Sequence, residues 1–314
     1  WLLGILLFTG CDDYLKEDSG DLLIPGKVEE FLPMLYREGF PRNFDDEVAW
    51  LYLMTDDVEM GQLELDPDDE NNDTRDKNSV DAFSVGEGEE PYKWERDIKS
   101  YADNFWERRY GNILACNLVI DALPEMVYVE ADSGSYNFLA AQAYAMRAYH
   151  YWCLVNSYAL PWSKENLDEP GVVIRTEPQI DIAARRRSSI REVYDLINED
   201  IENAEKYIKV ATFDGNIHRL SEPAILLLAS RIALFQENWD EVIRTGKLFL
   251  AQNSIILNLN DQDTTLFGTE KGLSNKIFTM MDGTINKEVV FTFGTSSYSR
   301  SEEHTSELQS RVDI

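Results

Sequence analysis

Apolar residues recur with the period of an α-helix in the middle of the chain, between residues 106 and 120. One stripe repeats at steps of four, three, four and three residues, a spacing that places side chains on one helix face. The stripe consists of Trp106, Tyr110, Ile113, Asn117 and Ile120. We therefore predict a helix whose striped face contacts a core. The Asn117 amide on that face needs a buried hydrogen-bond partner, which favours a structural role over a ligand contact.

A second helix is predicted over residues 137–159, where apolar residues surround the helix nearly completely. A helix of this kind either lies between other helices or spans a membrane. Arg147 argues against a membrane span, because an arginine at the centre of a bilayer is costly. No catalytic or metal-ligating partners lie near His150 in the sequence. We expect His150 to be a satisfied histidine of the core or the surface.

Capping residues mark where two later helices begin, and a turn marks the start of a third. Ser189 and Glu192 form a capping box, in which the hydroxyl and the carboxylate satisfy free amides at the start of a helix. Ser221, with Pro223 in the first turn, starts the next helix. A short turn then leads into a helix near residues 239–251. This last helix pair resembles a tetratricopeptide unit, in which small residues let paired helices pack closely.

The remaining pattern completes a mainly α fold. We expect a helix near residues 27–37, a long acidic loop over residues 66–91 and a strand over residues 287–293. The fold class predicted is therefore a tetratricopeptide-like helical repeat scaffold with long irregular loops and a few short strands.

Composition narrows the class of partner. The 314 residues are 44% hydrophobic, enough for one large core or two smaller ones, and carry a formal net charge of −29. Residues 1–100 hold 27 acidic against 9 basic side chains. Nucleic acid is excluded as a partner, because phosphate backbones are bound by clustered Lys and Arg. The acidic excess hydrates the surface, with cation binding or partner steering as alternatives.

The two ends of the chain carry signals of their own. Residues 1–10 resemble the remnant of a lipoprotein signal peptide, too short to span a bilayer, and Cys11 follows as the predicted lipid attachment site. Alternatively, Cys11 merely follows a cleaved or buried segment. Asp12 and Asp13 resemble an export signal of surface lipoproteins in the Bacteroidetes. Residues 300–314 resemble a translated sequencing adapter, so we expect a non-native tail after a helical domain over residues 11–299 that is incomplete at its C-terminus.

Motifs for catalysis are absent from the sequence. We find no nucleophile elbow, phosphate-binding loop or zinc-protease helix, and only three histidines. Asp56 and Asp57 are adjacent, so in an extended segment they point apart, unlike the paired carboxylates of a glycosidase. A calcium loop at Asp66 lacks the glycine that its turn needs. We expect no cofactor and no metal, and we expect free thiols instead of a disulfide at the two remaining cysteines, Cys116 and Cys153.

Several segments, taken in order along the chain, carry a family resemblance. They are Trp106–Ile113 with Asn117 and Asp121, Ala143 with Arg147–Tyr151 and Leu154, Val193–Tyr194 with Ile197 and Asp200–Ile201, Ala224–Leu234, Trp239, and Glu288–Phe291. In this combination they resemble the SusD/RagB family of outer-membrane nutrient-binding lipoproteins. The resemblance implies a lid on a SusC-like TonB-dependent transporter that captures oligosaccharides. The chain departs from the family where Ala159 and Leu160 replace a glycine, and family members usually continue further.

The function predicted is therefore non-catalytic binding of a glycan or another nutrient at the cell surface, by a protein anchored in the outer membrane through its N-terminal lipid. Sugar binding needs aromatic rings beside polar groups. Tyr92, Trp94 and Trp162 are the candidates in loops, although each could equally be a packing residue. A lipid-anchored glycoside hydrolase and a protein-interaction scaffold without carbohydrate binding remain as alternatives.

Overall fold

The computed structural model describes residues 27–41, 93, 99–126, 128–179, 185–256, 288–298 and 308–313. Cys11, Tyr92, Trp94, Asp56–Asp57 and the acidic loop lie outside the described residues. The elements of the described part are α1 (Val28–Met34), η2 (Leu35–Gly39), α5 (Lys99–Ala122), η3 (Leu123–Glu125), η4 (Glu130–Asp132), α6 (Ser133–Tyr158), α7 (Ile190–Ile208), α8 (Glu222–Phe235), α9 (Trp239–Gln252), β1 (Thr292–Tyr298) and β2 (Leu308–Asp313).

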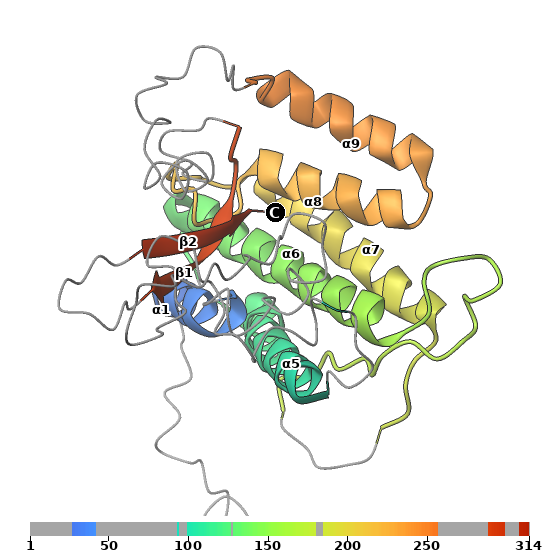
Figure 1. The fold of residues 1–314 in the computed structure, drawn as a ribbon. Helices are drawn as coiled ribbons and strands as arrows, with labels where there is room; N and C mark the ends of the chain where they lie inside the picture. The colour runs from blue at the N-terminus through green and yellow to red at the C-terminus, as the bar shows by residue number, and fades with distance from the viewer. Residues whose placement is uncertain are drawn as a thin grey trace, which may run out of the picture.

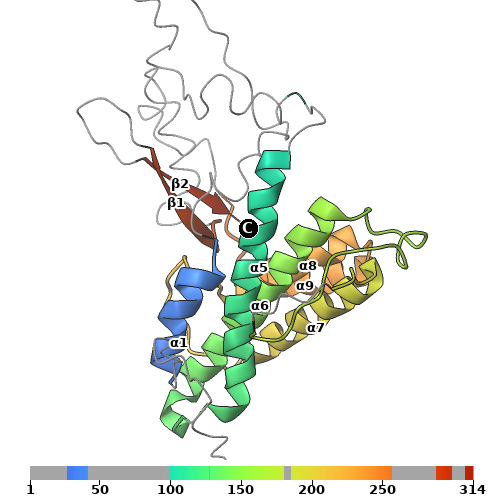
Figure 2. The same ribbon diagram turned by 90° about the horizontal axis from the view of Figure 1, so that it is seen from below.

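The long helices form an array in chain order, with α5, α6, α7, α8 and α9 each packed against the next (Figure 1). Helix α1 and the π-helical turn η2 lie beside α5 and contact α6 (Figure 2). The mainly α fold predicted from the sequence is confirmed, and so are the predicted helices.

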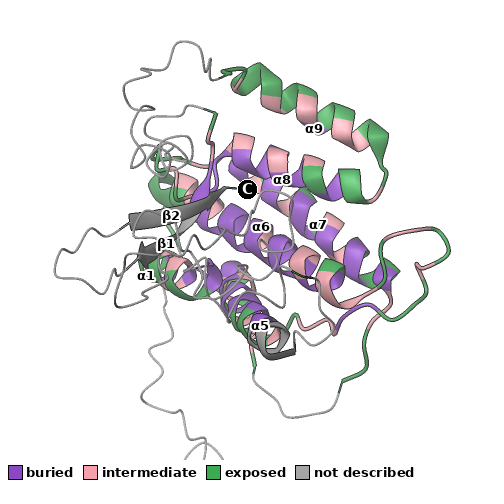
Figure 3. Ribbon diagram, in the orientation of Figure 1, coloured by how far each residue is buried: buried purple, intermediate pink, exposed green. Residues whose placement is uncertain are grey.

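Helix α6 lies between its neighbours and is the most deeply buried element (Figure 3). Its small residues allow this close approach on several sides, since Ala140, Ala141, Ala143, Ala145 and Ala148 are all inaccessible to solvent. The prediction of a helix surrounded by others is thus confirmed. Among the described helices, none combines the length and the apolar character that a membrane crossing requires.

Side-chain caps start the last three helices, and the caps at Ser189 and Ser221 confirm the prediction. Ser189 accepts a hydrogen bond from the Glu192 amide while the Glu192 carboxylate accepts one from the Ser189 amide at 2.7 Å, which is a complete capping box. Ser221 caps α8 in the same way, through the Ala224 amide. Asn238 caps α9 and follows the tight turn after α8. The paired helices α8 and α9 form the predicted tetratricopeptide-like unit.

One sequence prediction needs correction. The strand expected over residues 287–293 begins only at Thr292, and residues 289–291 have no regular secondary structure. Phe291 is fully buried against the helical core, next to Phe40 at 6.1 Å between ring centres. The apolar run therefore reflects docking onto the helices, which an apolar pattern alone cannot distinguish from a buried strand. Strand β1 pairs in antiparallel fashion with β2, which comes from the segment predicted as a non-native tail.

Candidate functional site

A buried polar cluster fixes the relative positions of α5, α6 and α7. The Arg147 guanidinium donates to both carboxylate oxygens of Asp200, at 2.8 and 2.7 Å, and to Asn117 Oδ1 at 3.0 Å. The side chains of Arg147 and Asp200 are 7% and 1% exposed. Burial raises the pKa of the Asp200 carboxyl to about 6, against the opposing effect of Arg147. Asn117 is thus the structural residue that the sequence predicted.

The same cluster holds the extended segment over residues 171–179. Asn117 Nδ2 donates to the Arg175 carbonyl at 2.9 Å, and the Tyr151 hydroxyl donates to the same carbonyl at 2.7 Å. The Tyr110 hydroxyl donates to the Val173 carbonyl, also at 2.7 Å. Because this segment joins α6 to α7, these contacts fix the path of the loop that carries Trp162.

Two separate pairs of aromatic rings lie near the C-terminal end of α6. Trp106 lies edge-on to Tyr158, with 4.9 Å between ring centres, and Trp162 lies edge-on to Tyr194 at 4.7 Å. Trp106, Tyr158 and Trp162, which we call the aromatic end, are all half-buried, whereas Tyr194 is fully buried. Each ring of the aromatic end therefore keeps some surface for solvent or a ligand.

Polar groups surround the aromatic end. The Arg187 guanidinium lies 5.9 Å from the centre of the Trp106 ring and donates to the Tyr158 carbonyl at 3.1 Å. Asn166 Nδ2 donates to the Pro161 carbonyl at 2.9 Å. Apolar ring surface beside amide and guanidinium groups is the combination that suits a sugar, whose ring has apolar faces and hydroxyl edges.

The predicted candidates relate to the aromatic end in different ways. Trp162 is part of it, and its packing on Tyr194 gives it a structural role as well. Tyr92 and Trp94 lie outside the described residues, although α5 starts only five residues after Trp94 in the sequence. Whether these three residues bind a glycan stays a prediction.

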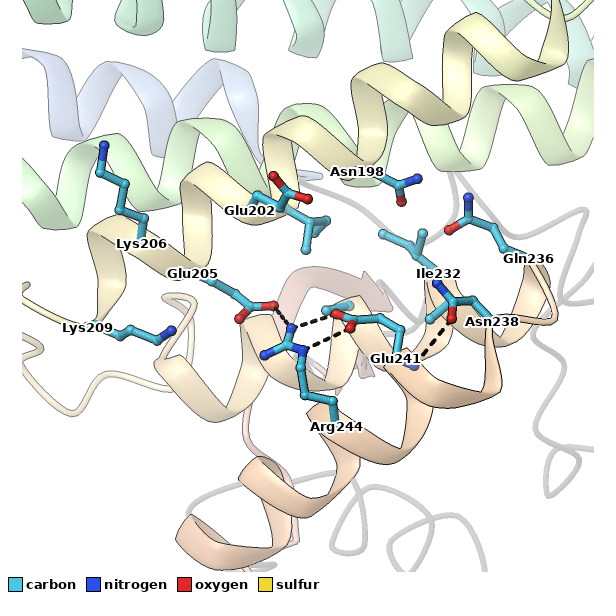
Figure 4. A pocket seen from close by; sticks show the side chains of 13 residues that line it. Asn198, Glu202, Glu205, Lys206, Lys209, Ile232, Gln236, Asn238, Glu241 and Arg244 are labelled. Carbon is cyan, nitrogen blue, oxygen red and sulfur yellow. Dashed lines mark hydrogen bonds and ion pairs between the residues drawn. The ribbon is translucent and has the colours of Figure 1, made fainter.

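A groove of about 450 Å³ lies between α7, α8 and α9 (Figure 4). Its lining includes Ile201 and Ile232, and Arg244 points between Glu205 and Glu241, within 2.6 Å of an oxygen of each (Figure 4). Its lining contains no aromatic side chain. The groove therefore suits a polar or charged chain better than the apolar face of a sugar ring.

His150, the histidine singled out in the sequence, has a structural role. His150 is inaccessible to solvent, and its Nε2 donates to the Gly39 carbonyl at 2.7 Å while its Nδ1 accepts from Arg109 at 3.0 Å. Burial, and then the charge of Arg109, lower the pKa of His150 well below 6.5. Among the described residues, no group of His, Cys, Asp or Glu side chains could hold a metal ion. Cys116 and Cys153 are free thiols as predicted, although Cys153 is only half-buried.

Sequence reasoning missed two features. It did not pair Arg147 with Asp200, although both residues belong to the segments that carry the family resemblance. It also overlooked a row of tyrosines on α6 and α7, because Tyr144 was counted within the apolar helix and Tyr136 precedes the predicted start of that helix. Their spacing of eight residues, slightly more than two helical turns, was the available signal.

The fold and these surfaces define a class of protein: a helical repeat scaffold of the tetratricopeptide type that presents a half-exposed aromatic surface and a polar groove. A protein-family comparison gives the particular family. The SusD-like family described as starch-binding and associating with the outer membrane matches residues 41–234. The chain belongs to this SusD-like family, as its sequence resemblance indicated.

Individual relatives agree with this assignment. A SusD-like protein of Formosa agariphila is 28% identical over 158 residues, which are 49% of this chain and 27% of that relative. A SusD-like carbohydrate-binding protein from Bacteroides vulgatus has 19% identity and a TM-score of 0.59, over 85% of this chain and 51% of the other. A laminarin-binding SusD-like protein has 16% identity and a TM-score of 0.56, over 84% and 50%. The chain thus spans about half the length of these solved structures, which share its fold.

Proposed function

We propose that this chain belongs to a non-catalytic, glycan-binding lipoprotein of the cell surface that works with a SusC-like TonB-dependent transporter. The observation that carries the proposal is the match, over residues 41–234, to a family described as starch-binding and associating with the outer membrane. The shared fold with a laminarin-binding protein supports an oligosaccharide or a polysaccharide as the ligand.

The aromatic end is the surface that we assign to the glycan. The half-exposed rings of Trp106, Tyr158 and Trp162 offer apolar faces to a pyranose ring. Arg187 and Asn166 lie beside them and provide donors for the sugar hydroxyls. Tyr92 and Trp94 precede α5, and we include them in the proposed glycan site.

A panel of polysaccharides tests the glycan function. In affinity gel electrophoresis, the protein encoded by the complete gene, with Cys11 changed to Ser, should be retarded by at least one of starch and laminarin. Trp94→Ala and Trp162→Ala should each reduce the retardation, because each removes a ring from the proposed site. A protein that no polysaccharide of a broad panel retards would contradict the proposal.

The proposal includes a lipid anchor at Cys11, which would hold the protein in the outer membrane, facing the cell exterior. Several acyl chains together bind a membrane stably, because each buried CH₂ contributes about 0.8 kcal/mol. Metabolic labelling with radioactive palmitate should mark the parent protein and leave Cys11→Ser unlabelled. Equal labelling of both would show that the lipid is attached elsewhere.

Two other functions stay open to direct tests. A lipid-anchored glycoside hydrolase would release reducing ends from a polysaccharide, and we expect none to be released. A protein-interaction scaffold is favoured by one observation, the polar groove between α7, α8 and α9 without aromatic lining. Co-purification with the SusC-like transporter is expected for the glycan-binding lipoprotein. A scaffold without carbohydrate binding would also retain a protein partner, but no polysaccharide would retard it.

A further inference from the structure

Four tyrosines form a continuous row at the opposite end of α6 from the aromatic end. Tyr128 stacks on Tyr136 with 4.3 Å between ring centres and an interplanar angle of 20°. The Tyr207 ring lies 6.4 Å from Tyr136 and 5.9 Å from Tyr144. Tyr136 and Tyr144 belong to α6 and Tyr207 belongs to the adjacent α7 (Figure 1). We call these four residues the tyrosine row.

The row extends along α6. Tyr136 and Tyr144 are eight residues apart on α6, a rise of about 12 Å along the helix. The Tyr207 ring, which comes from the neighbouring helix, lies near both rings at the two distances given above. Tyr128 extends the row beyond Tyr136 and is 43% exposed, whereas the other three side chains are half-buried.

The hydroxyl groups of the row are largely unused by the protein. The Tyr136 hydroxyl donates to the Leu123 carbonyl at 3.1 Å. Within the described part of the chain, the hydroxyls of Tyr128, Tyr144 and Tyr207 have no hydrogen-bond partner. A buried tyrosine with a purely structural role usually pairs its hydroxyl within the protein. Three hydroxyls of the row are not paired in this way and lie beside partly open rings, so they are available to a ligand.

The charges around the row favour a neutral ligand. The Lys206 ammonium lies 5.5 Å from the centre of the Tyr207 ring, and Glu199 lies close enough to Tyr144 to act on its hydroxyl electrostatically. Arg147, beneath Tyr144, is neutralised by Asp200. Exposed Glu125, Glu130 and Asp132 flank Tyr128 in the chain, so the charges near the row disfavour an anionic chain over a neutral one.

We propose that the tyrosine row is a second contact surface for a neutral glycan chain, separate from the aromatic end. The proposal rests on the glycan-binding function above. Tyr136 and Tyr158 are 22 residues apart on α6, a rise of about 33 Å, so a short oligosaccharide reaches only one of the two surfaces and a longer glycan chain is needed for both. Two weak contacts on one polymer strengthen each other through their high effective concentration, and binding should therefore depend on chain length.

The test compares variants of the complete protein against laminarin and amylopectin by affinity gel electrophoresis. Tyr128→Ala and the pair Tyr128→Ala/Tyr207→Ala remove rings from the row. Trp162→Ala removes a ring from the aromatic end, and Trp239→Ala, which removes a 58% exposed ring on α9, is the matched control. Tyr128→Ala is included because this outermost side chain can be removed without opening the core, should the pair impair folding.

We expect the pair to weaken binding of the retained polysaccharide at least fivefold, Tyr128→Ala about twofold or more, and Trp239→Ala less than twofold. Tyr128→Phe/Tyr207→Phe should restore part of the loss, because it returns the rings without the hydroxyls. Full affinity in both row variants, with a loss in Trp162→Ala, would overturn the second surface and leave the glycan function standing. Failure of the parent to bind either polysaccharide would overturn both the second surface and the glycan function for these two ligands.

Discussion

The substitution Arg147→Met tests the idea that a buried ion pair fixes α6 against α7. It removes two charge-assisted hydrogen bonds of 2.8 and 2.7 Å to Asp200, whose side chain is only 1% exposed. A buried carboxylate left without its partner costs about 3–5 kcal/mol. We therefore expect the free energy of unfolding at pH 7.5, from urea titration followed by circular dichroism, to fall by that amount.

The loss should depend on pH in a defined direction. Burial already raises the pKa of Asp200 to about 6 in the presence of Arg147, and removing the guanidinium raises it further. The folded variant then holds a proton that the unfolded chain, with a carboxyl pKa near 3.8, releases. Stability of Arg147→Met should therefore fall as pH rises from 4 toward the raised folded-state pKa, so the variant is closer to the parent at pH 5 than at pH 7.5.

Two controls isolate the buried pair. Arg147→Met combined with Asp200→Leu removes both charges and should restore stability to within about 1 kcal/mol of the parent or above it. Arg191→Met breaks an exposed pair with Asp168 and should cost less than about 1 kcal/mol. A loss below about 1 kcal/mol in Arg147→Met alone, or no recovery in the double variant, would refute the argument.

Two further changes give defined outcomes. His150→Gln keeps a donor and an acceptor but cannot be protonated. The pKa of His150 is held well below 6.5 in the folded protein, so only the unfolded parent takes up a proton as the pH falls from 6.5 to 5. The free energy of unfolding of the parent should therefore fall by up to about 2 kcal/mol relative to this variant over that range. Parallel urea titrations across that range would contradict the assignment of a neutral histidine. Ser189→Ala removes the α7 cap and should cost about 1 kcal/mol, whereas Ser188→Ala, beside it, should not change stability measurably.

Sequence patterns predicted the helices well because local signals agreed with the tertiary packing. The capping box at Ser189 and the alanine-rich face of α6 each define their element without information from the rest of the chain. The predicted strand near residue 290 starts too early in the sequence. Phe291 belongs to the apolar run because it packs against Phe40, which is far away in the sequence, and not because it lies in a strand. Pairings between distant segments, such as Arg147 with Asp200, could not be assigned from periodicity.

The candidate site was less predictable for the same reason. Trp162 could be named from its position after a helix, but Trp106 and Tyr158, which are far apart in the sequence, come together only because α5 and α6 run in opposite directions. The tyrosine row likewise combines a loop residue, two residues of α6 and one of α7. Surfaces assembled from several elements need the fold before their chemistry can be recognised.

The most direct test of glycan binding is the affinity of the complete protein for laminarin and amylopectin, measured by calorimetric titration beside Trp162→Ala and Trp239→Ala. The account predicts saturable binding of at least one polysaccharide, weakened at least fivefold by Trp162→Ala and less than twofold by Trp239→Ala, with both variants unfolding at the temperature of the parent within a few degrees. Equal affinities in all three proteins would contradict the assigned site. If neither laminarin nor amylopectin gave a heat of binding, the result would contradict glycan binding for these two polysaccharides.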